Sequence, residues 1–305
     1  MPRLIMVFAP QSAFGSDFDM QQNNMPDNSQ NTSVEAVNED KEAETSIQTD
    51  TLIVAAVVPV LADVGKDETK KIRYRAKPKF PMPVSAKVLL LDLDGTLVDT
   101  AGDIATAANR MRAAFGFGAL EPAVIRNFIG RGIANLVSLS MKSAVGELGA
   151  GATKVAIAQF EKQYESCLAD TSRPFPGVFE GLELFKEKGF KLACITNKSE
   201  RFTLPLLEKT ALAGYFELVV SGDSLAEKKP HPLPIQHAAK HFGVKVEELV
   251  FIGDSMHDAA AARAAGCPVF IVPYGYNEGQ ELRGLDCDAF IDDLPAALKY
   301  VKITA

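Results

Sequence analysis

The stretch Val88-Leu89-Leu90-Leu91-Asp92-Leu93-Asp94-Gly95-Thr96-Leu97-Val98-Asp99-Thr100 carries most of the information about fold and site. Its first four residues are apolar, as expected of a strand that is buried on both faces of a sheet. Side chains alternate along a strand, so we expect Asp92 and Asp94 to leave its end on the same side. Two carboxylates at the end of a buried strand are costly unless a cation or a reaction requires them. The stretch therefore predicts a reactive site, and a metal-dependent one.

The composition is typical of a soluble globular protein. The chain has 305 residues, of which 47% are hydrophobic and 23% charged, enough for one large domain or two ordinary ones. Its net charge of −7 gives no reason to expect nucleic acid as a partner. No apolar stretch approaches the roughly 20 residues needed to cross a bilayer. We therefore expect neither nucleic acid nor a membrane as a partner, whereas the sequence leaves both a monomer and a homodimer open.

The cysteines indicate the cellular compartment in which the protein is expected. The four of them lie far apart and form no CxxC pair or zinc-ligand spacing: Cys167, Cys194, Cys267 and Cys287. In a chain of this length the pattern favours reduced, buried thiols. The apolar stretch after Arg3 is shorter than the roughly 7–15 residues of a signal-peptide core. We therefore expect a cytoplasmic protein.

Residues 1–84 differ in composition from the rest of the chain. Residues 16–50 are rich in Asn, Gln, Ser, Asp and Glu, and cannot bury enough apolar surface to offset the entropy lost on ordering. Residues 66–79 are strongly basic, and prolines at positions 78, 81 and 83 close the segment. We predict a disordered N-terminal extension with a proline-rich linker over residues 1–84. A partner-binding or targeting tail is the alternative.

From Val88 onward, strand and helix patterns alternate. Apolar runs predict further strands at 191–196, 218–221, 249–252, 268–272 and 289–291. Helical spacing predicts helices between them at 178–188, 200–212, 233–242, 257–265 and 294–301. Such alternation implies a parallel sheet, whose ligands bind beyond the carboxyl ends of the strands. We predict an α/β fold with a Rossmann-like parallel sheet core and helices on both faces.

A long helical insert separates the first two strands. Apolar residues recur at helical spacing over 104–116, 134–148 and 154–169, which is far more helix than one crossover requires. Because the insert directly follows the carboxylate-bearing strand, we interpret it as a lid over the site. The predicted domains are a core of residues 85–100 and 173–305 and an inserted α-helical cap of residues 101–172.

Three further segments bring polar groups to the ends of strands in the same sheet. They are Ile195-Thr196-Asn197-Lys198, Lys228-Lys229-Pro230-His231-Pro232 and Phe251-Ile252-Gly253-Asp254-Ser255-Met256-His257-Asp258. Together with the opening stretch they supply four acids, a hydroxyl and a lysine at one rim. Phosphoryl transfer needs such a set: a nucleophile, an acid/base, donors for the phosphoryl oxygens and a cation.

This pattern resembles the haloacid dehalogenase superfamily. Its first motif, DxDx[TV], matches Asp92-Leu93-Asp94-Gly95-Thr96, and its fourth, GDxxxD, matches residues 253–258. Thr196 matches the second motif, a Thr or Ser that ends a strand, and Lys229 matches the third. All four motifs occur in order, and the resemblance covers residues 88 to about 300.

The chemistry and the resemblance together imply the catalytic roles. Asp92 attacks the phosphorus and forms an aspartyl-phosphate, which splits hydrolysis into two easier steps. Asp94 protonates the leaving alkoxide and then deprotonates the attacking water. Thr196 and backbone N–H groups after Asp92 hold the phosphoryl oxygens, and Lys229 offsets their charge. Lys228 competes with Lys229 for this role, and Lys229 is favoured because it directly precedes the proline.

The resemblance also implies a Mg²⁺ site, because this hard ion prefers oxygen ligands. The expected metal-site residues are Asp92, Asp94 through its backbone carbonyl, Asp254 and Asp258, of which Asp258 is favoured to position Lys229 or a metal-bound water. Two other interpretations are weaker. The stretch from Asp92 to Gly95 superficially resembles a calcium-binding loop, but it lacks the later oxygen ligands and the closing Glu of such a loop. Asp254 and Asp258 could merely be a turn residue and a charge at a helix N-terminus.

Within the superfamily, the chain resembles the bacterial phosphoglycolate phosphatases. The segments that carry this resemblance are residues 93–100, Phe128-Ile129-Gly130-Arg131-Gly132, Lys229-Pro230-His231-Pro232 and Tyr274-Gly275-Tyr276-Asn277. Gly130 and Gly132 would allow close approach to substrate, and Arg131 could pair with a substrate carboxylate or be an ordinary exposed arginine. The expected substrate-binding residues are Gly95, Thr96, Asn197, Gly130, Arg131 and Gly132.

The resemblance thus implies a Mg²⁺-dependent phosphatase that acts on a small phosphorylated substrate, 2-phosphoglycolate, and releases glycolate and phosphate. A related phosphatase of small monoesters or a phosphosugar mutase is the alternative enzyme. A phosphate- or metal-binding regulatory module is the non-enzymatic alternative, but it would be marked by loss of Asp92 or Asp94, and both are present.

Overall fold

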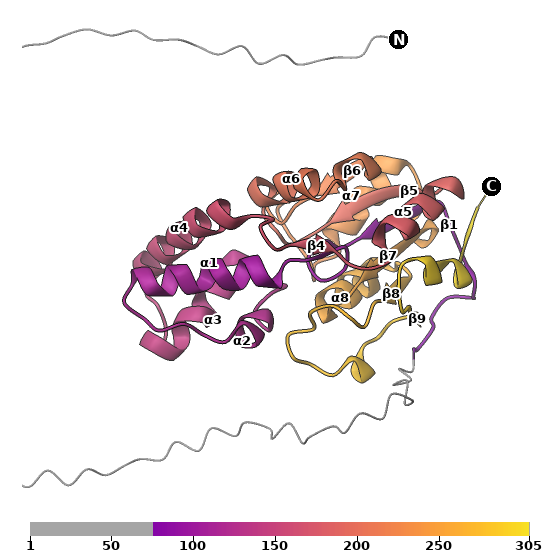
Figure 1. Cartoon of the computed structure of the whole chain (residues 1–305). Helices are drawn as coiled ribbons and strands as arrows, with labels where there is room; N and C mark the ends of the chain where they lie inside the picture. The colour runs from indigo at the N-terminus through magenta and orange to yellow at the C-terminus, as the bar shows by residue number, and fades with distance from the viewer. Residues whose placement is uncertain (1–75, 305) are drawn as a thin grey trace, which may run out of the picture. The chain divides into compact units, whose positions relative to one another are not determined.

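The computed structural model describes residues 76–304, and at its centre is a six-stranded sheet in which every neighbouring pair of strands is parallel. The strand order is β6-β5-β2-β7-β8-β9 (Figure 1). The strands are β2 (Val88–Leu91), β5 (Lys191–Ile195), β6 (Leu218–Val220), β7 (Leu249–Gly253), β8 (Val269–Ile271) and β9 (Ala289–Phe290). The predicted α/β fold with a parallel sheet is confirmed.

Strand β2 lies between β5 and β7, and all four of its residues are buried. Its side chains alternate between two hydrophobic clusters: Leu89 and Leu91 belong to one, and Val88 and Leu90 belong to the other. Leu91 pairs in register with Cys194 of β5 and with Ile252 of β7. The residue after Leu91 therefore emerges between the ends of β5 and β7.

Helices cover both faces of the sheet, as predicted. The first cluster contains residues of α5 (Val178–Glu187) and α6 (Glu200–Lys209). The second contains residues of α7 (Leu233–Phe242) and α8 (Met256–Ala265). These four helices follow the apolar spacing that predicts them, because each presents one buried stripe to the sheet.

Four helices follow one another between β3 (Val98–Asp99) and β4 (Arg173–Pro174), which pair antiparallel. They are α1 (Ala101–Ala114), α2 (Pro122–Arg126), α3 (Ile133–Val145) and α4 (Ala150–Cys167). Figure 1 shows them gathered beside the sheet-bearing part. Helix α2 was missed by the helical patterns because it has only five residues. We refer to residues 101–172 as the cap.

The base of the cap is tied together by one buried carboxylate. Asp103, in the first turn of α1, accepts hydrogen bonds from the backbone N–H and hydroxyl groups of Thr171 and Ser172. Burial disfavours the charge of Asp103, but these hydrogen bonds hold its pKa below the usual value. The entry and exit of the cap are thereby held side by side.

The prediction of a helix at 294–301 is wrong. A short 3-10 helix, η4 (Pro295–Lys299), is followed by strand β10 (Val301–Ile303), which pairs parallel with β1 (Val84–Ala86). That partner lies more than two hundred residues away, so local spacing could not reveal the strand. The remaining 3-10 helices are η1 (Ala213–Tyr215), η2 (Val246–Glu248) and η3 (Leu282–Gly284).

The predicted linker does not extend to residue 84. The backbone N–H of Lys77 donates to the Cys287 carbonyl at 2.8 Å, and that of Lys79 donates to Asp288 Oδ1 at 2.6 Å. Residues 77–79 are thus held against the core because hydrogen bonds from two of their backbone N–H groups to Cys287 and Asp288 offset the cost of ordering them. The prediction of disorder over residues 1–75 lies outside the described residues. Within residues 76–304, no helix is long and apolar enough to cross a membrane.

Candidate active site

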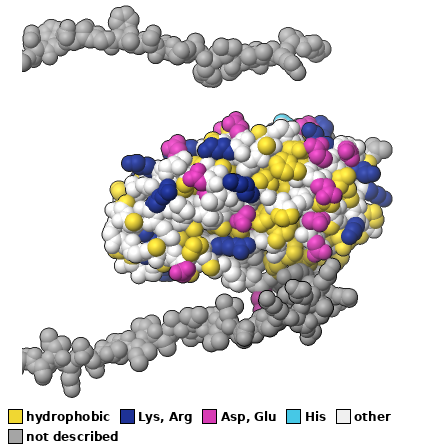
Figure 2. Space-filling view, in the orientation of Figure 1, with side chains coloured by type: hydrophobic (Ala, Val, Ile, Leu, Met, Phe, Trp, Pro, Cys, Tyr) yellow, Lys and Arg dark blue, Asp and Glu magenta, His cyan; other side chains and the backbone are white. Residues whose placement is uncertain are grey.

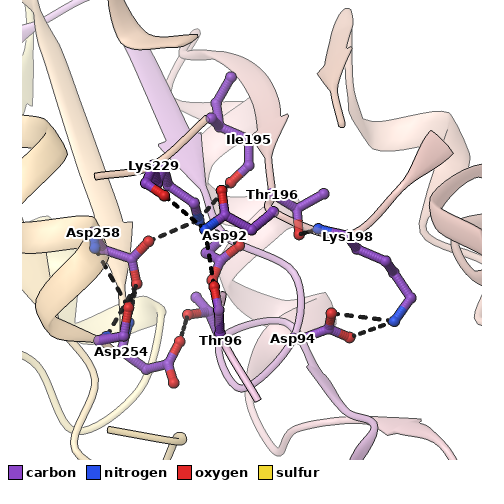
Figure 3. Close-up of polar contacts among 12 residues, drawn as sticks. Asp92, Asp94, Thr96, Ile195, Thr196, Lys198, Lys229, Asp254 and Asp258 are labelled. Atoms are coloured by element: carbon purple, nitrogen blue, oxygen red, sulfur yellow. Dashed lines mark hydrogen bonds and ion pairs between the residues drawn. The ribbon is translucent and has the colours of Figure 1, made fainter. Parts of the chain in front are cut away.

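Asp92 lies at the centre of a buried ion-pair network at the carboxyl end of the sheet (Figure 3). Lys229 Nζ lies 2.7 Å from Asp92 Oδ1 and 2.7 Å from Asp258 Oδ1. The same ammonium donates to the Ile195 carbonyl at 2.9 Å. Lys228, by contrast, is exposed and donates to the Arg131 carbonyl. The lysine that directly precedes the proline is therefore the one beside Asp92.

The network perturbs the acidity of its members. Burial raises the pKa of Asp92 to about 7, with Asp258 adding to the shift and Lys229 opposing it. Burial disfavours the ammonium of Lys229, but Asp258 and Asp92 together raise its pKa above the usual value. A carboxylate with a strongly shifted pKa beneath a cap is a candidate for chemistry rather than for fold stability alone.

A third carboxylate completes an acidic cluster that could hold a metal ion. Oxygens of Asp92, Asp254 and Asp258 lie within 4.8 Å of one another. Burial raises the pKa of Asp254 well above its usual value, and the charges of Asp258 and Asp92 raise it further. Three crowded buried carboxylates repel one another unless a cation balances them. The donor set, oxygen throughout, fits a hard divalent cation.

The hydrogen bonds of Asp258 favour a positioning role over metal binding. Its Oδ1 contacts Lys229, and its Oδ2 accepts from the backbone N–H groups of Asp254 and Ser255 and from the Ser255 hydroxyl at 2.7 Å. Ser255 and Asp258 form a capping box at the start of α8. Both carboxylate oxygens thus already have partners in the protein.

Thr96 and Gly95 shape the wall beside Asp254. The hydroxyl of Thr96 donates to Asp254 Oδ1 at 2.8 Å, so it orients that carboxylate. Gly95 has a φ of +90°, and a Cβ on it would lie 2.4 Å from Asp254 Oδ2. Glycine fits here because, without a Cβ, it adopts this positive φ easily and lets the Asp254 carboxylate come close.

The carboxylate of Asp94 points away from the acidic cluster (Figure 3). Lys198 Nζ lies 3.0 and 3.1 Å from its two oxygens, and the Thr100 hydroxyl donates to Oδ1 at 2.7 Å. A metal contact from Asp94 would therefore have to come from its backbone carbonyl. Lys198 was not predicted from the sequence to be a site residue, although its position two residues after Thr196 could have indicated that it lies near the site.

The loop after β5 contributes Thr196 and Asn197. Thr196 is buried, and its hydroxyl accepts from the Lys198 backbone N–H at 3.2 Å. The side-chain amide of Asn197 donates to the carbonyls of Gly130 and Lys229 at 2.8 and 2.9 Å. Asn197 therefore links the cap to the loop that bears Lys229.

The Arg131 side chain is turned toward the core surface. Its guanidinium makes a bidentate contact with Glu278, with Nε and Nη2 at 2.8 and 2.6 Å from the two oxygens. Glu278 in turn lies 2.8 Å from His257 Nε2. The predicted pairing of Arg131 with a substrate carboxylate competes with this contact. Gly132, with a φ of +87°, brings the cap backbone close to Lys228 Nζ.

The aromatic segment after β8 supports the start of the cap. The Tyr276 hydroxyl accepts from the backbone N–H groups of Thr100 and Ala101 at 2.8 and 3.1 Å and contacts Asp99. The Tyr274 hydroxyl donates to the Thr96 carbonyl at 2.9 Å. The segment therefore fixes the chain on both sides of the turn after Asp94.

A narrow cavity of about 50 Å³ lies between cap and core. Its polar or charged lining comes from Asp92, Asp94, Thr196, Asn197, Lys198 and Tyr164, and its apolar lining includes Ile104, Phe128, Leu136, Phe160 and Phe202. Gly130 and Gly132 also line it, whereas Arg131 is not among its lining residues. Residues of the cap thus line the cavity beside Asp92 and Asp94.

The model of the haloacid dehalogenase-like hydrolase family matches residues 89–272, from β2 to the end of β8. The chain belongs to this family. The acidic cluster, the lysine beside it and the cap are therefore parts of a hydrolase.

Similar proteins share most of the described part. A phosphoglycolate phosphatase of Nitrosospira multiformis is 47% identical over 73% of this chain and 98% of its own length. Another, from Thiobacillus denitrificans, is 48% identical over 73% of this chain and 97% of its own. The crystal structure of a predicted phosphoglycolate phosphatase from Haemophilus somnus is 33% identical, with a TM-score of 0.67 over 70% of this chain and 97% of that one.

Proposed function

We propose that this protein is a Mg²⁺-dependent phosphatase that hydrolyses 2-phosphoglycolate to glycolate and phosphate. The observation that carries the proposal is the buried Asp92–Lys229–Asp254–Asp258 cluster at the strand ends beneath the cap. Relatives of nearly the same length as the folded part are named phosphoglycolate phosphatases, which supports the choice of ester. The narrow cavity favours a small substrate.

In the proposed reaction, Asp92 Oδ attacks the phosphorus, and an aspartyl-phosphate forms as the alkoxide of glycolate leaves. Asp94 gives its proton to that alkoxide and then takes one from the water that hydrolyses the intermediate. Lys229, fixed by Asp258 at 2.7 Å, balances the charge on the phosphoryl oxygens. Thr196 and the backbone after Asp92 donate hydrogen bonds to the same oxygens.

Asp92, Asp254 and the Asp94 carbonyl would hold Mg²⁺, which supplies positive charge that stabilises the transferring phosphoryl group. Thr96 keeps Asp254 oriented for this purpose. The raised pKa values of Asp92 and Asp254 support the proposal, because a bound cation would restore both carboxylates to their charged form.

The proposed location is the cytoplasm. Cys167, Cys194, Cys267 and Cys287 are all free and buried, which suits a reducing compartment. The state of association, monomer or homodimer, stays a prediction.

The test is phosphate release from a panel of small phosphate esters, with and without Mg²⁺, by the full chain and by Asp92→Asn. We expect 2-phosphoglycolate to be preferred, Mg²⁺ to be required, and Asp92→Asn to lose at least about 10³-fold in kcat. Comparable turnover by Asp92→Asn would contradict the nucleophile. A clear preference for another ester would contradict the substrate alone, and return of the phosphoryl group to a sugar would indicate a mutase.

A further inference from the structure

We propose that Lys198 Nζ and the Tyr164 hydroxyl together bind the carboxylate of the substrate. The inference rests on the proposed function and specifies how the site would recognise the end of 2-phosphoglycolate that does not react. It assigns this role to Lys198 and Tyr164, neither of which was predicted from the sequence to bind substrate, in place of Arg131.

Lys198 carries a positive charge into the cavity. Its side chain is 4% exposed, and its ammonium contacts Asp94 on one side and lies 4.8 Å from the centre of the Tyr164 ring. An ammonium has three N–H donors, so the contacts with the two oxygens of Asp94 leave one donor for a ligand. Among the described residues that line the cavity, Lys198 is the one cation. A buried anionic ligand would find its charge partner here.

Tyr164 brings a hydroxyl from the cap to the same place. It lies on α4, is buried, and lines the cavity. Within the part of the chain that the structure describes, its hydroxyl has no hydrogen bond of good geometry, and the polar group that it interacts with is the Lys198 ammonium. Burial raises the pKa of Tyr164, so the group stays a neutral donor. An ammonium can only donate, so the proton of the buried hydroxyl has no acceptor, which is costly, and a carboxylate oxygen would accept it.

The position of Lys198 suits the length of the substrate. Lys198 follows Thr196 by two residues, and its backbone N–H donates to the Thr196 hydroxyl. In 2-phosphoglycolate the ester oxygen and one CH₂ group separate the phosphorus from the carboxylate carbon. A loop that holds the phosphoryl group through Thr196 therefore presents Lys198 to the other end. The walls beyond are apolar, including Phe160 and Phe202, and offer no competing charge.

Arg131 is the rival cation. It lies outside the cavity lining, its side chain is 50% exposed, and its guanidinium is already paired with Glu278. Binding a substrate carboxylate would require Arg131 to leave a bidentate partner. Lys198 also contacts a carboxylate, that of Asp94, at 3.0 and 3.1 Å, but it lines the cavity and its third N–H can turn to a ligand while Asp94 stays in place.

The test compares 2-phosphoglycolate with ethyl phosphate, which has the same chain length but lacks the carboxylate. We expect Lys198→Met to lower kcat/KM for 2-phosphoglycolate about 10- to 100-fold more than for ethyl phosphate, since a charged hydrogen bond contributes about 1.5–3 kcal/mol. Tyr164→Phe should lower the same ratio about 3- to 10-fold, mainly through KM. Arg131→Met, the matched rival, should leave the ratio unchanged.

Each outcome decides something. Equal losses for both esters in Lys198→Met would show that Lys198 only positions Asp94, and would overturn the inference. A selective loss in Arg131→Met would overturn it in favour of Arg131. If the wild type itself shows no preference for 2-phosphoglycolate, the proposed function fails and the inference fails with it. If the wild type has the preference and Lys198→Met keeps it, the inference alone fails.

Discussion

The substitution Asp258→Asn measures how strongly the ion pair with Lys229 holds the site together. The carboxylate and the ammonium are 0% and 2% exposed and lie 2.7 Å apart. An amide keeps the shape and can still accept from Ser255 and Asp254, but its NH₂ group would face the lysine. Removing one partner of a buried pair costs about 3–5 kcal/mol.

We expect the lower end of that range, about 3 kcal/mol, because Lys229 keeps Asp92 at 2.7 Å. In a folded part of this size the loss corresponds to a fall in Tm of roughly 6–12 °C. Urea unfolding of the full chain, followed by circular dichroism with EDTA present, gives the free energy of unfolding without a contribution from metal.

Glu217→Gln is the matched control. It makes the same chemical change in the Glu217–Lys191 pair, which is 3.5 Å long and more than half exposed on both sides, and should cost less than about 1 kcal/mol. If Asp258→Asn costs no more than the control, the argument that Asp258 fixes Lys229 is wrong.

The remaining predictions concern the base of the cap and the turn after Asp94. Because the folded state lowers the pKa of Asp103, its charge stabilises the fold above the unfolded pKa, and that contribution is lost as pH falls through the folded pKa. The advantage of wild type over Asp103→Asn, measured by urea unfolding, should thus be largest near neutral pH and shrink below about pH 4; an advantage that grows on acidification would contradict this. Gly95→Ala should destabilise the chain and raise the Mg²⁺ concentration needed for half-maximal activity, since its Cβ would meet Asp254. Gly116→Ala, with a φ of +79° and open space around it, measures the backbone strain alone, about 1 kcal/mol, and an equal effect of the two would refute the steric argument.

The course of the chain through the core was largely predictable. Apolar runs marked β2, β5 and β7, and parallel strands bring their carboxyl ends to one rim. Residues that follow those strands, such as Asp92, Thr196 and Asp254, therefore had to lie near one another. Two kinds of element were not predictable from local patterns. Strand β10 pairs with the distant strand β1, and α2 is too short to show a helical period.

The sequence by itself determined the family, the sheet and the acids at the strand ends, because periodicity and motif order are local properties of the chain. Only the tertiary structure decided which cations pair with Asp94 and Glu278. Lys198 reaches Asp94, and Arg131 reaches Glu278 across the cap boundary. The partners in each pair are separated by more than a hundred residues. Lys198 meets Asp94 because β5 lies beside β2 in the sheet, and Arg131 meets Glu278 because the cap packs on the core. Asp92 pairs with Lys229, the lysine that the sequence already favoured for the site, whereas the pairing of Asp94 with Lys198 emerged only from the tertiary structure.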